Sequence, residues 1–115
     1  MQDGWIGQMR KGVAEFCVLS VLARGEAYGY EILTEISKHP SLSLKESTLY
    51  LMLARLEKEG FVRMRQVKSD KGPARRYFRL TETGETRLQD MGRFWADFAA
   101  DVSVLTEKGA PDGGT

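Results

Sequence analysis

The sequence predicts a mainly α-helical protein with one small β-hairpin, and three observations lead to this fold class. Apolar residues recur at helical spacing in three stretches before residue 60. Two short runs at 61–67 and 75–81 then alternate between apolar and polar residues. A last stretch, 82–106, repeats apolar residues at alternating steps of three and four. With 115 residues, 42% of them hydrophobic, the chain has the size and composition of one soluble domain.

Two helices are expected in the first 40 residues. Residues 10–24, RKGVAEFCVLSVLAR, are apolar nearly all the way round, which is typical of a central helix, and Gly25 is suited to cap its C-terminus. Residues 28–38, YGYEILTEISK, form the second helix, in which Gly29 should let neighbouring backbones approach. The expected core face of this second helix carries Tyr30, Leu33 and Ile36.

A third helix is predicted to begin just after Ser43 and to run to Gly60. Ser43 and Glu46 have the spacing of a capping box, in which the two side chains satisfy backbone amides at the helix start. Apolar residues form one stripe that should face the core, made by Leu49, Met52, Leu53 and Leu56. The opposite side is small, apolar and basic, and it carries Ser47, Leu51, Ala54, Arg55 and Lys58.

The two alternating runs predict an antiparallel hairpin with one face on the core. The apolar residues expected on that face are Val62, Met64, Phe78 and Leu80. The segment KSDKGPA between the runs, with its Gly-Pro pair, is expected to form the turn. Residues 61–81 contain seven basic residues against Asp70 alone, a net charge of +6 in a chain whose formal charge is +1. Such a local basic patch is typical of a phosphate-binding surface.

Three helices followed by a two-stranded hairpin is the element order of the winged helix-turn-helix, here expected over residues 1–81. In that arrangement the third helix enters the major groove, and the wing lies along phosphates or an adjacent minor groove. A basic hairpin alone indicates only a solvated turn, but one that directly follows a recognition-type helix favours DNA binding. The candidate DNA-binding residues on the third helix are Ser47, Thr48, Tyr50, Leu51 and Arg55. Those on the wing are Lys68, Lys71, Arg75 and Arg76.

Residues 82–106 are predicted to form a dimerisation helix, with the N-terminal helix as a further candidate for the interface. The a/d spacing of its apolar residues requires a partner helix. The residues of this predicted dimer or ligand surface are Leu88, Met91, Phe94, Trp95, Phe98, Val102 and Leu105. Two copies of Trp95 would meet across a twofold axis, where the indoles either sandwich a planar aromatic ligand or fill the dimer core. The sequence leaves both roles open. Trp5 is a further lining candidate, and residues 107–115 are expected to form a flexible tail.

The composition argues against an enzyme and against a secreted or membrane protein. His39 is the only histidine, so a histidine-based metal cluster is excluded, and neither a metal nor a cofactor is expected. Cys17 is the only cysteine; it permits no intramolecular disulfide, and its apolar surroundings should raise the thiol pKa and suppress nucleophilicity. The N-terminus has no signal-like pattern, and no run of 18 apolar residues occurs. We therefore expect a cytoplasmic protein.

Four motifs follow one another along the chain: LSVL, YGYEI, STLYLMLARLEKEGFV and KGPARRYFRLTETG. Over about residues 10–105 the chain resembles the PadR family of bacterial transcriptional regulators through this ordered combination. The resemblance implies a homodimeric DNA-binding repressor whose C-terminal helix forms the dimer contact and whose operator is pseudo-palindromic. It also implies that a small aromatic or hydrophobic effector often relieves repression. Leu51 stands where the family commonly has proline, so the operator sequence cannot be borrowed from a relative.

The alternative hypothesis is a winged-helix protein-interaction module that does not bind DNA specifically. In that case the C-terminal helix would recruit a protein partner, and the basic wing would only be solvated. A third hypothesis is a protein that sequesters a ligand at the dimer interface without affecting DNA. Binding to the protein's own upstream DNA separates these hypotheses from the first.

Overall fold

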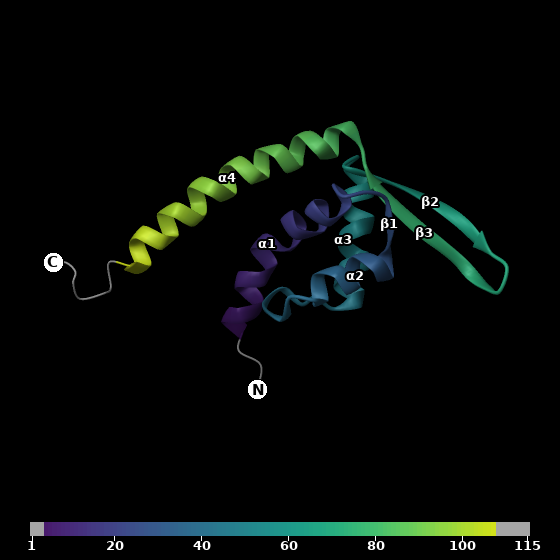
Figure 1. The fold of residues 1–115 in the computed structure, drawn as a ribbon, viewed down its shortest axis with the longest axis horizontal. Coiled ribbons are helices and arrows are strands. Elements are labelled where there is room, and N and C mark those ends of the chain that lie inside the picture. The colour runs from purple at the N-terminus through teal and green to yellow at the C-terminus, as the bar shows by residue number, and fades with distance from the viewer. Residues whose placement is uncertain (1–3, 108–115) are drawn as a thin grey trace.

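The computed structural model describes residues 4–107 (Figure 1). Its elements are α1 (Gly4–Leu22), β1 (Ala27–Tyr28), α2 (Gly29–Ser37), η1 (Pro40–Leu42), α3 (Glu46–Lys58), β2 (Val62–Ser69), β3 (Gly72–Leu80) and α4 (Glu82–Glu107). The hairpin and α4 leave the helical layer at the same corner and extend to opposite sides. The predicted class, mainly helical with a small sheet and a long C-terminal helix, is confirmed. Glu107 still belongs to α4, and the rest of the predicted tail lies outside the described residues.

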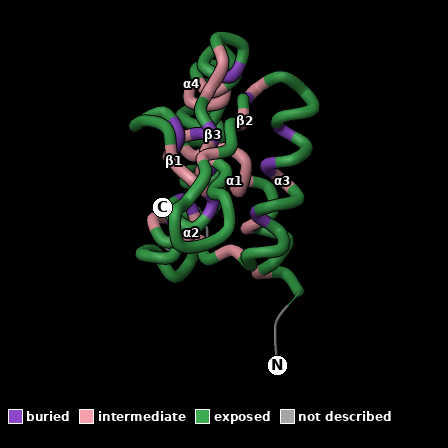
Figure 2. Tube along the Cα trace, turned by 90° about the vertical axis from the view of Figure 1, so that its right-hand side faces the viewer, coloured by how far each residue is buried: buried purple, intermediate pink, exposed green. Residues whose placement is uncertain are grey.

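One apolar core joins the three N-terminal helices to the sheet (Figure 2). Its buried residues are Val18, Leu19, Leu22, Ile32, Ile36, Leu49, Leu53, Leu56, Val62 and Phe78. The predicted stripe of α3 is confirmed, since three of its leucines are buried and Met52 packs against them. The predicted core face of the hairpin is also confirmed, because Met64 and Leu80 pack beside its two buried residues. Each fully buried side chain of this size contributes about 1.5–3 kcal/mol.

A third strand, which the sequence did not indicate, completes an antiparallel sheet of order β1-β3-β2. Ala27 of β1 pairs with Phe78 of β3, and Tyr28 pairs with Tyr77. Two residues are too few to show the alternation that predicts a strand from sequence. β1 therefore forms because the connection from α1 to α2 passes along β3.

The first two helices differ from the prediction at their ends and on one face. α1 begins at Gly4 and ends at Leu22, so Gly25 lies in the turn beyond it rather than at its cap. Tyr30 is 62% exposed, and the prediction that it faces the core is wrong. Ile32 and Ile36, four residues apart, define the buried face of α2, and Tyr30 lies too far round the helix from them to share it.

The predicted capping box of α3 is wrong as well. α3 begins at Glu46 with Lys45 in the N-cap position, so Ser43 lies two residues too early to cap it. Ser43 instead ends the 3₁₀ turn η1, which occupies the chain between α2 and α3. A carboxylate does cap α2, where the Tyr28 N–H donates to Glu31 Oε1 at 3.0 Å.

The turn of the hairpin lies within the predicted segment but is shorter, and it does not include the Gly-Pro pair. Ser69 pairs with Gly72, so Asp70 and Lys71 make the turn, and the Gly-Pro pair lies inside β3. Pro73 cannot donate a backbone hydrogen bond, and strands normally exclude it from paired positions. It is tolerated because the β2–β3 register shifts at this point and because β1 pairs only with the far end of β3.

Backbone contacts fix the corner from which α4 departs. Gly60 adopts φ +86°, the left-handed conformation that ends α3. Thr81 Oγ1 donates to the Gly60 carbonyl at 2.6 Å and accepts from the Gly84 N–H at 3.0 Å, which caps α4. Gly84 is buried, and a Cβ at this position would collide with the Phe61 carbonyl oxygen. The direction of α4 is thus set by close packing of its first turn on the α3–β2 connection.

Candidate nucleic-acid interface

The exposed face of α3 carries polar and apolar side chains close to the helix start. Ser47 and Thr48 are exposed in the first turn, and Leu51, one turn further, is 74% exposed. The first backbone N–H groups of a helix lack intrahelical partners, so this end can also donate to an anion. Hydroxyls, amides and an apolar side chain together suit phosphate oxygens and the edges of bases.

Tyr50 lies where α3 meets the start of α2. Its ring and hydroxyl pack against Gly29 so closely that a Cβ there would collide with them. Gly29 therefore does permit a close approach, as predicted, but to an aromatic side chain rather than to a second backbone. The phenol remains 38% exposed, so packing orients Tyr50 without hiding it.

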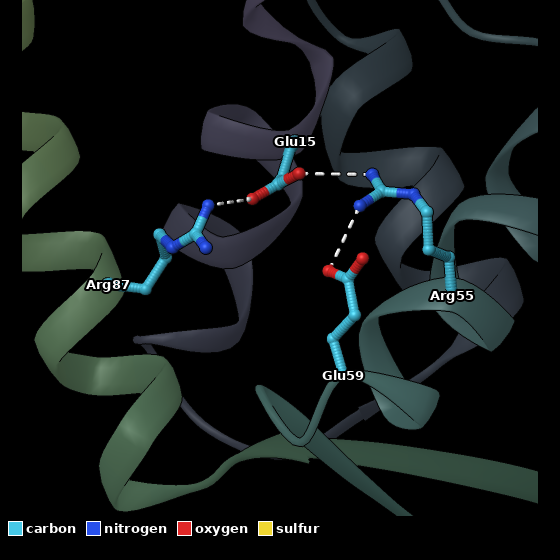
Figure 3. Close-up of polar contacts among 4 residues, drawn as sticks. All are labelled: Glu15, Arg55, Glu59 and Arg87. Atoms are coloured by element: carbon cyan, nitrogen blue, oxygen red, sulfur yellow. Dashed lines mark hydrogen bonds and ion pairs between the residues drawn. The ribbon is translucent and has the colours of Figure 1, made fainter.

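Arg55 is held in a four-residue ion network that joins three helices (Figure 3). Its guanidinium donates to Glu15 of α1 at 3.0 Å and to Glu59 at 3.2 Å, and the Glu15 hydrogen bond raises the pKa of Arg55. Arg87 of α4 reaches the other Glu15 oxygen at 3.4 Å and stacks on the Phe61 ring at 4.2 Å. These ion pairs link α3 to α1 through Arg55, an arrangement that favours a role in holding α3 against α1.

The four predicted wing residues are exposed but do not share one face. Arg75 points away from the core, whereas Arg76, the next residue of β3, points to the opposite side of the ribbon. Lys68 lies near the end of β2, and Lys71 lies in the turn. The outer face, opposite the core, carries Arg63, Arg65, Arg75 and Arg79.

Aromatic rings and one carboxylate orient two of the outer-face arginines. Arg65 donates twice to Glu26, both at 2.7 Å, and its guanidinium lies 5.4 Å from the Tyr77 ring centre. Tyr77 meets Tyr28 edge-on at 5.4 Å, and Arg75 lies over Tyr28 at 4.7 Å. The hydrogen bonds from Arg65 lower the pKa of Glu26. Exposed pairs of this kind add little stability, so their effect is on side-chain orientation.

An open apolar groove of about 1160 Å³ lies between α1 and α4. Five of the seven residues of the predicted dimer or ligand surface line it: Met91, Phe94, Trp95, Phe98 and Val102. Leu88 packs on the core instead, and Leu105 lies beyond the groove with 72% of its surface exposed. Trp5 of α1 also lines the groove, as the sequence suggested.

Aromatic side chains make up much of this groove. The Trp95 ring lies 5.9 Å from Phe16 of α1 and 6.0 Å from Phe98, and Phe94 stacks on Phe98 at 5.5 Å. Phe94 is nevertheless 67% exposed and Trp95 is 40% exposed. A contiguous apolar surface of this kind marks a protein interface or a ligand groove.

Sequence reasoning missed the partners that hold these side chains. Glu15 is the one acidic residue of the apolar stretch 10–24, a signal that could have singled it out. Glu26 and Arg87 had no such signal, because their partners lie 39 and 72 residues away in the chain.

Membrane spans, metal sites and the single cysteine can be assessed over the described residues. None of the helices within residues 4–107 is long and apolar enough to cross a membrane. The same residues contain no group of three histidine, cysteine or acidic side chains placed to hold a metal ion. Cys17 is half-buried in α1, and burial raises the pKa of its thiol, as the sequence indicated.

A helix-turn-helix followed by a basic hairpin and a long fourth helix defines a winged helix-turn-helix protein of the transcriptional-regulator class. The chain belongs to the PadR-like family of transcriptional regulators, whose family model matches residues 18–90. It is similar to an uncharacterized protein of Lysinibacillus sphaericus, with 30% identity over 99 residues that cover 84% of this chain and 91% of that protein.

Solved structures agree with this family. A PadR-like transcriptional regulator from Bacillus cereus superposes with a TM-score of 0.77 at 33% identity, covering 87% of this chain and 97% of that one. Bacillus subtilis PadR in complex with operator DNA superposes with a TM-score of 0.64 at 28% identity, covering 69% of this chain and 46% of that one.

Proposed function

We propose that this protein is a cytoplasmic, sequence-specific DNA-binding repressor that acts as a homodimer. The observation that carries the proposal is that the exposed face of α3 is followed directly by the basic wing, with a net charge of +6 over residues 61–81. A helix can read base edges in the major groove, while a flanking basic ribbon neutralises phosphates. The similarity to a PadR protein bound to operator DNA supports the same role here.

The proposed reading surface of α3 consists of Ser47, Thr48, Tyr50 and Leu51. Arg55 was predicted to contact DNA too, but its ion pairs with Glu15 and Glu59 favour a role in positioning α3. The proposed phosphate contacts of the wing are Lys68, Lys71, Arg75 and Arg76. Because Arg75 and Arg76 point to opposite sides of the ribbon, they would meet different phosphates.

The groove between α1 and α4 supports the proposed dimer. Its aromatic residues are exposed in the single chain, and a second copy related by a twofold axis would cover them. Two wings and two copies of α3 would then match a pseudo-palindromic operator. A small aromatic or hydrophobic effector bound beside Trp95 in this groove would relieve repression by changing the spacing of the two α3 helices.

A gel-shift series tests DNA binding directly. We expect a discrete complex with the DNA upstream of the protein's own gene, and unrelated duplex should compete at least about a thousandfold less well. The discrimination is expected because α3 presents groups that distinguish base edges, whereas the wing alone binds any duplex. If unrelated duplex competes as well as the upstream DNA, the result contradicts sequence-specific regulation and supports the protein-interaction hypothesis.

Wing substitutions should weaken binding to all sequences alike. Replacing both Arg75 and Arg76 by alanine removes two charges, and the slope of log affinity against log salt should flatten by about 0.9 for each phosphate that the variant no longer neutralises. Single substitutions at the two positions will show which side of the ribbon meets DNA. Arg93→Ala is the control, because it removes an exposed positive charge from α4, away from the wing. An unchanged slope in the double variant would show that these wing residues do not contact DNA phosphates.

A further inference from the structure

Leu51 is the most exposed large hydrophobic side chain among residues 4–107, at 74%. Three other large hydrophobic residues that are more than half exposed, Trp5, Met9 and Phe94, line the groove between α1 and α4, but Leu51 is not part of that lining. It is also outside the core cluster of the described residues. Neither folding nor the proposed dimer therefore accounts for an apolar side chain here.

The surroundings of Leu51 place it on the proposed reading surface. It lies four residues after Ser47 and three after Thr48, so the three side chains share one face of α3. The neighbouring Tyr50 packs on Gly29, and this packing restricts the movement of the Tyr50 side chain toward Leu51. Leu51 thus projects from a rigid helix beside two hydroxyls.

The chemistry of the major groove contains one common apolar group, the C5-methyl of thymine. Hydroxyls such as those of Ser47 and Thr48 can bond to either donors or acceptors and so discriminate weakly between bases. An aliphatic side chain gains only where it removes apolar surface from water. We infer that Leu51 is a specificity-determining residue that selects thymine at one position of each half-site through its C5-methyl group.

This inference rests on the proposed function, since it requires α3 to lie in the major groove. It differs from that proposal in naming the base and the atom that one residue reads. The contact would exclude water from one methyl group and part of the leucine side chain. Loss of a buried methyl corresponds to about a fourfold loss of affinity for each half-site.

The test replaces thymines by deoxyuridine, which lacks only the methyl group. In a minimal upstream duplex defined by footprinting, each thymine is replaced in turn, and the Kd is measured by fluorescence anisotropy. We expect one position in each half-site at which deoxyuridine lowers wild-type affinity about fourfold. Leu51→Ala, which keeps a strong helix former, should bind thymine and deoxyuridine duplexes equally.

Ser47→Ala is the matched control: it removes a proposed DNA contact from the same face of α3, so it should weaken binding to the thymine and deoxyuridine duplexes alike and keep the ratio of their Kd values. If wild-type protein binds the duplex specifically but no deoxyuridine position matters, the inference is wrong and the proposed function stands. The inference is also wrong if Leu51→Ala retains the full thymine preference. If the unmodified upstream duplex is not bound specifically, both the proposed function and the inference fall.

Discussion

Replacing Gly84 by alanine should lower the free energy of unfolding by roughly 3 kcal/mol, because the new Cβ collides with backbone rather than with a side chain. The obstacle is the Phe61 carbonyl oxygen, which cannot rotate away because it accepts the Thr81 N–H at 3.1 Å. Leu80 Cδ2 lies 3.3 Å from the same Cβ and restricts its movement in another direction. The collision can be relieved only if the first turn of α4 moves away from the α3–β2 connection. This movement also disturbs the Thr81 cap.

Urea unfolding followed by circular dichroism, at one fixed protein concentration, measures this loss. The matched control is Gly7→Ala in α1, where a Cβ meets no atom of the described residues within 4 Å. Alanine there should leave stability unchanged or raise it by up to about 1 kcal/mol, because alanine favours helix. If Gly84→Ala unfolds at the same urea concentration as wild type, α4 does not approach Phe61 as closely as the structure indicates.

The parts of the fold that repeat a period over many residues could be predicted from the sequence. The leucine stripe of α3 recurs at helical spacing, and burial of that face enforces the period in the structure. The seam of α4 recurs at the same kind of spacing, and most of its residues line the open groove beside α1. The alternation in β2 and β3 is enforced in the same way by Val62 and Phe78, which are buried. Patterns of this kind survive because many residues would have to change together to break them.

Short features that depend on one tertiary contact could not be predicted. β1 exists because β3 lies beside it, and the turn of the hairpin is set by a register shift rather than by the Gly-Pro pair. The capping box at Ser43 matched the sequence pattern, but η1 occupies that part of the chain and α3 starts later. A local preference of about 1 kcal/mol does not determine the structure where the connection between two packed helices is this short.

The candidate site also contains some features that could be predicted from the sequence and others that could not. The exposure of Ser47, Thr48 and Leu51 follows from the buried stripe on the other side of α3 and could be predicted. The commitment of Arg55 to Glu15 could not, because the two residues are 40 positions apart and meet only when α1 packs beside α3. Sequence periodicity thus identifies which face of a helix is free, but not which of its long side chains are held by partners.

Phe98→Glu should convert the proposed dimer into a monomer and weaken DNA binding by two orders of magnitude or more. Phe98 is 47% exposed in the single chain and packs against both Phe94 and Trp95 in the groove lining, so a twofold partner would cover its remaining surface. Symmetry introduces the carboxylate twice, and burying an unpaired charge costs several kcal/mol. A monomer binds one half-site at a time and loses the effective concentration that links the two halves, on the order of 10²–10⁴ in affinity.

Light scattering after size-exclusion chromatography measures the mass of the particle, and the gel shift measures binding to the same upstream duplex. Ala96→Glu is the matched control, because it adds the same side chain to an exposed position of α4 that is outside the groove lining. The control should remain a dimer with wild-type affinity, and circular dichroism should show both variants folded. If the Phe98→Glu variant remains a dimer, the dimer interface lies elsewhere, because two carboxylates cannot be buried in this groove without partners. The aromatic surface between α1 and α4 would then require a different binding partner.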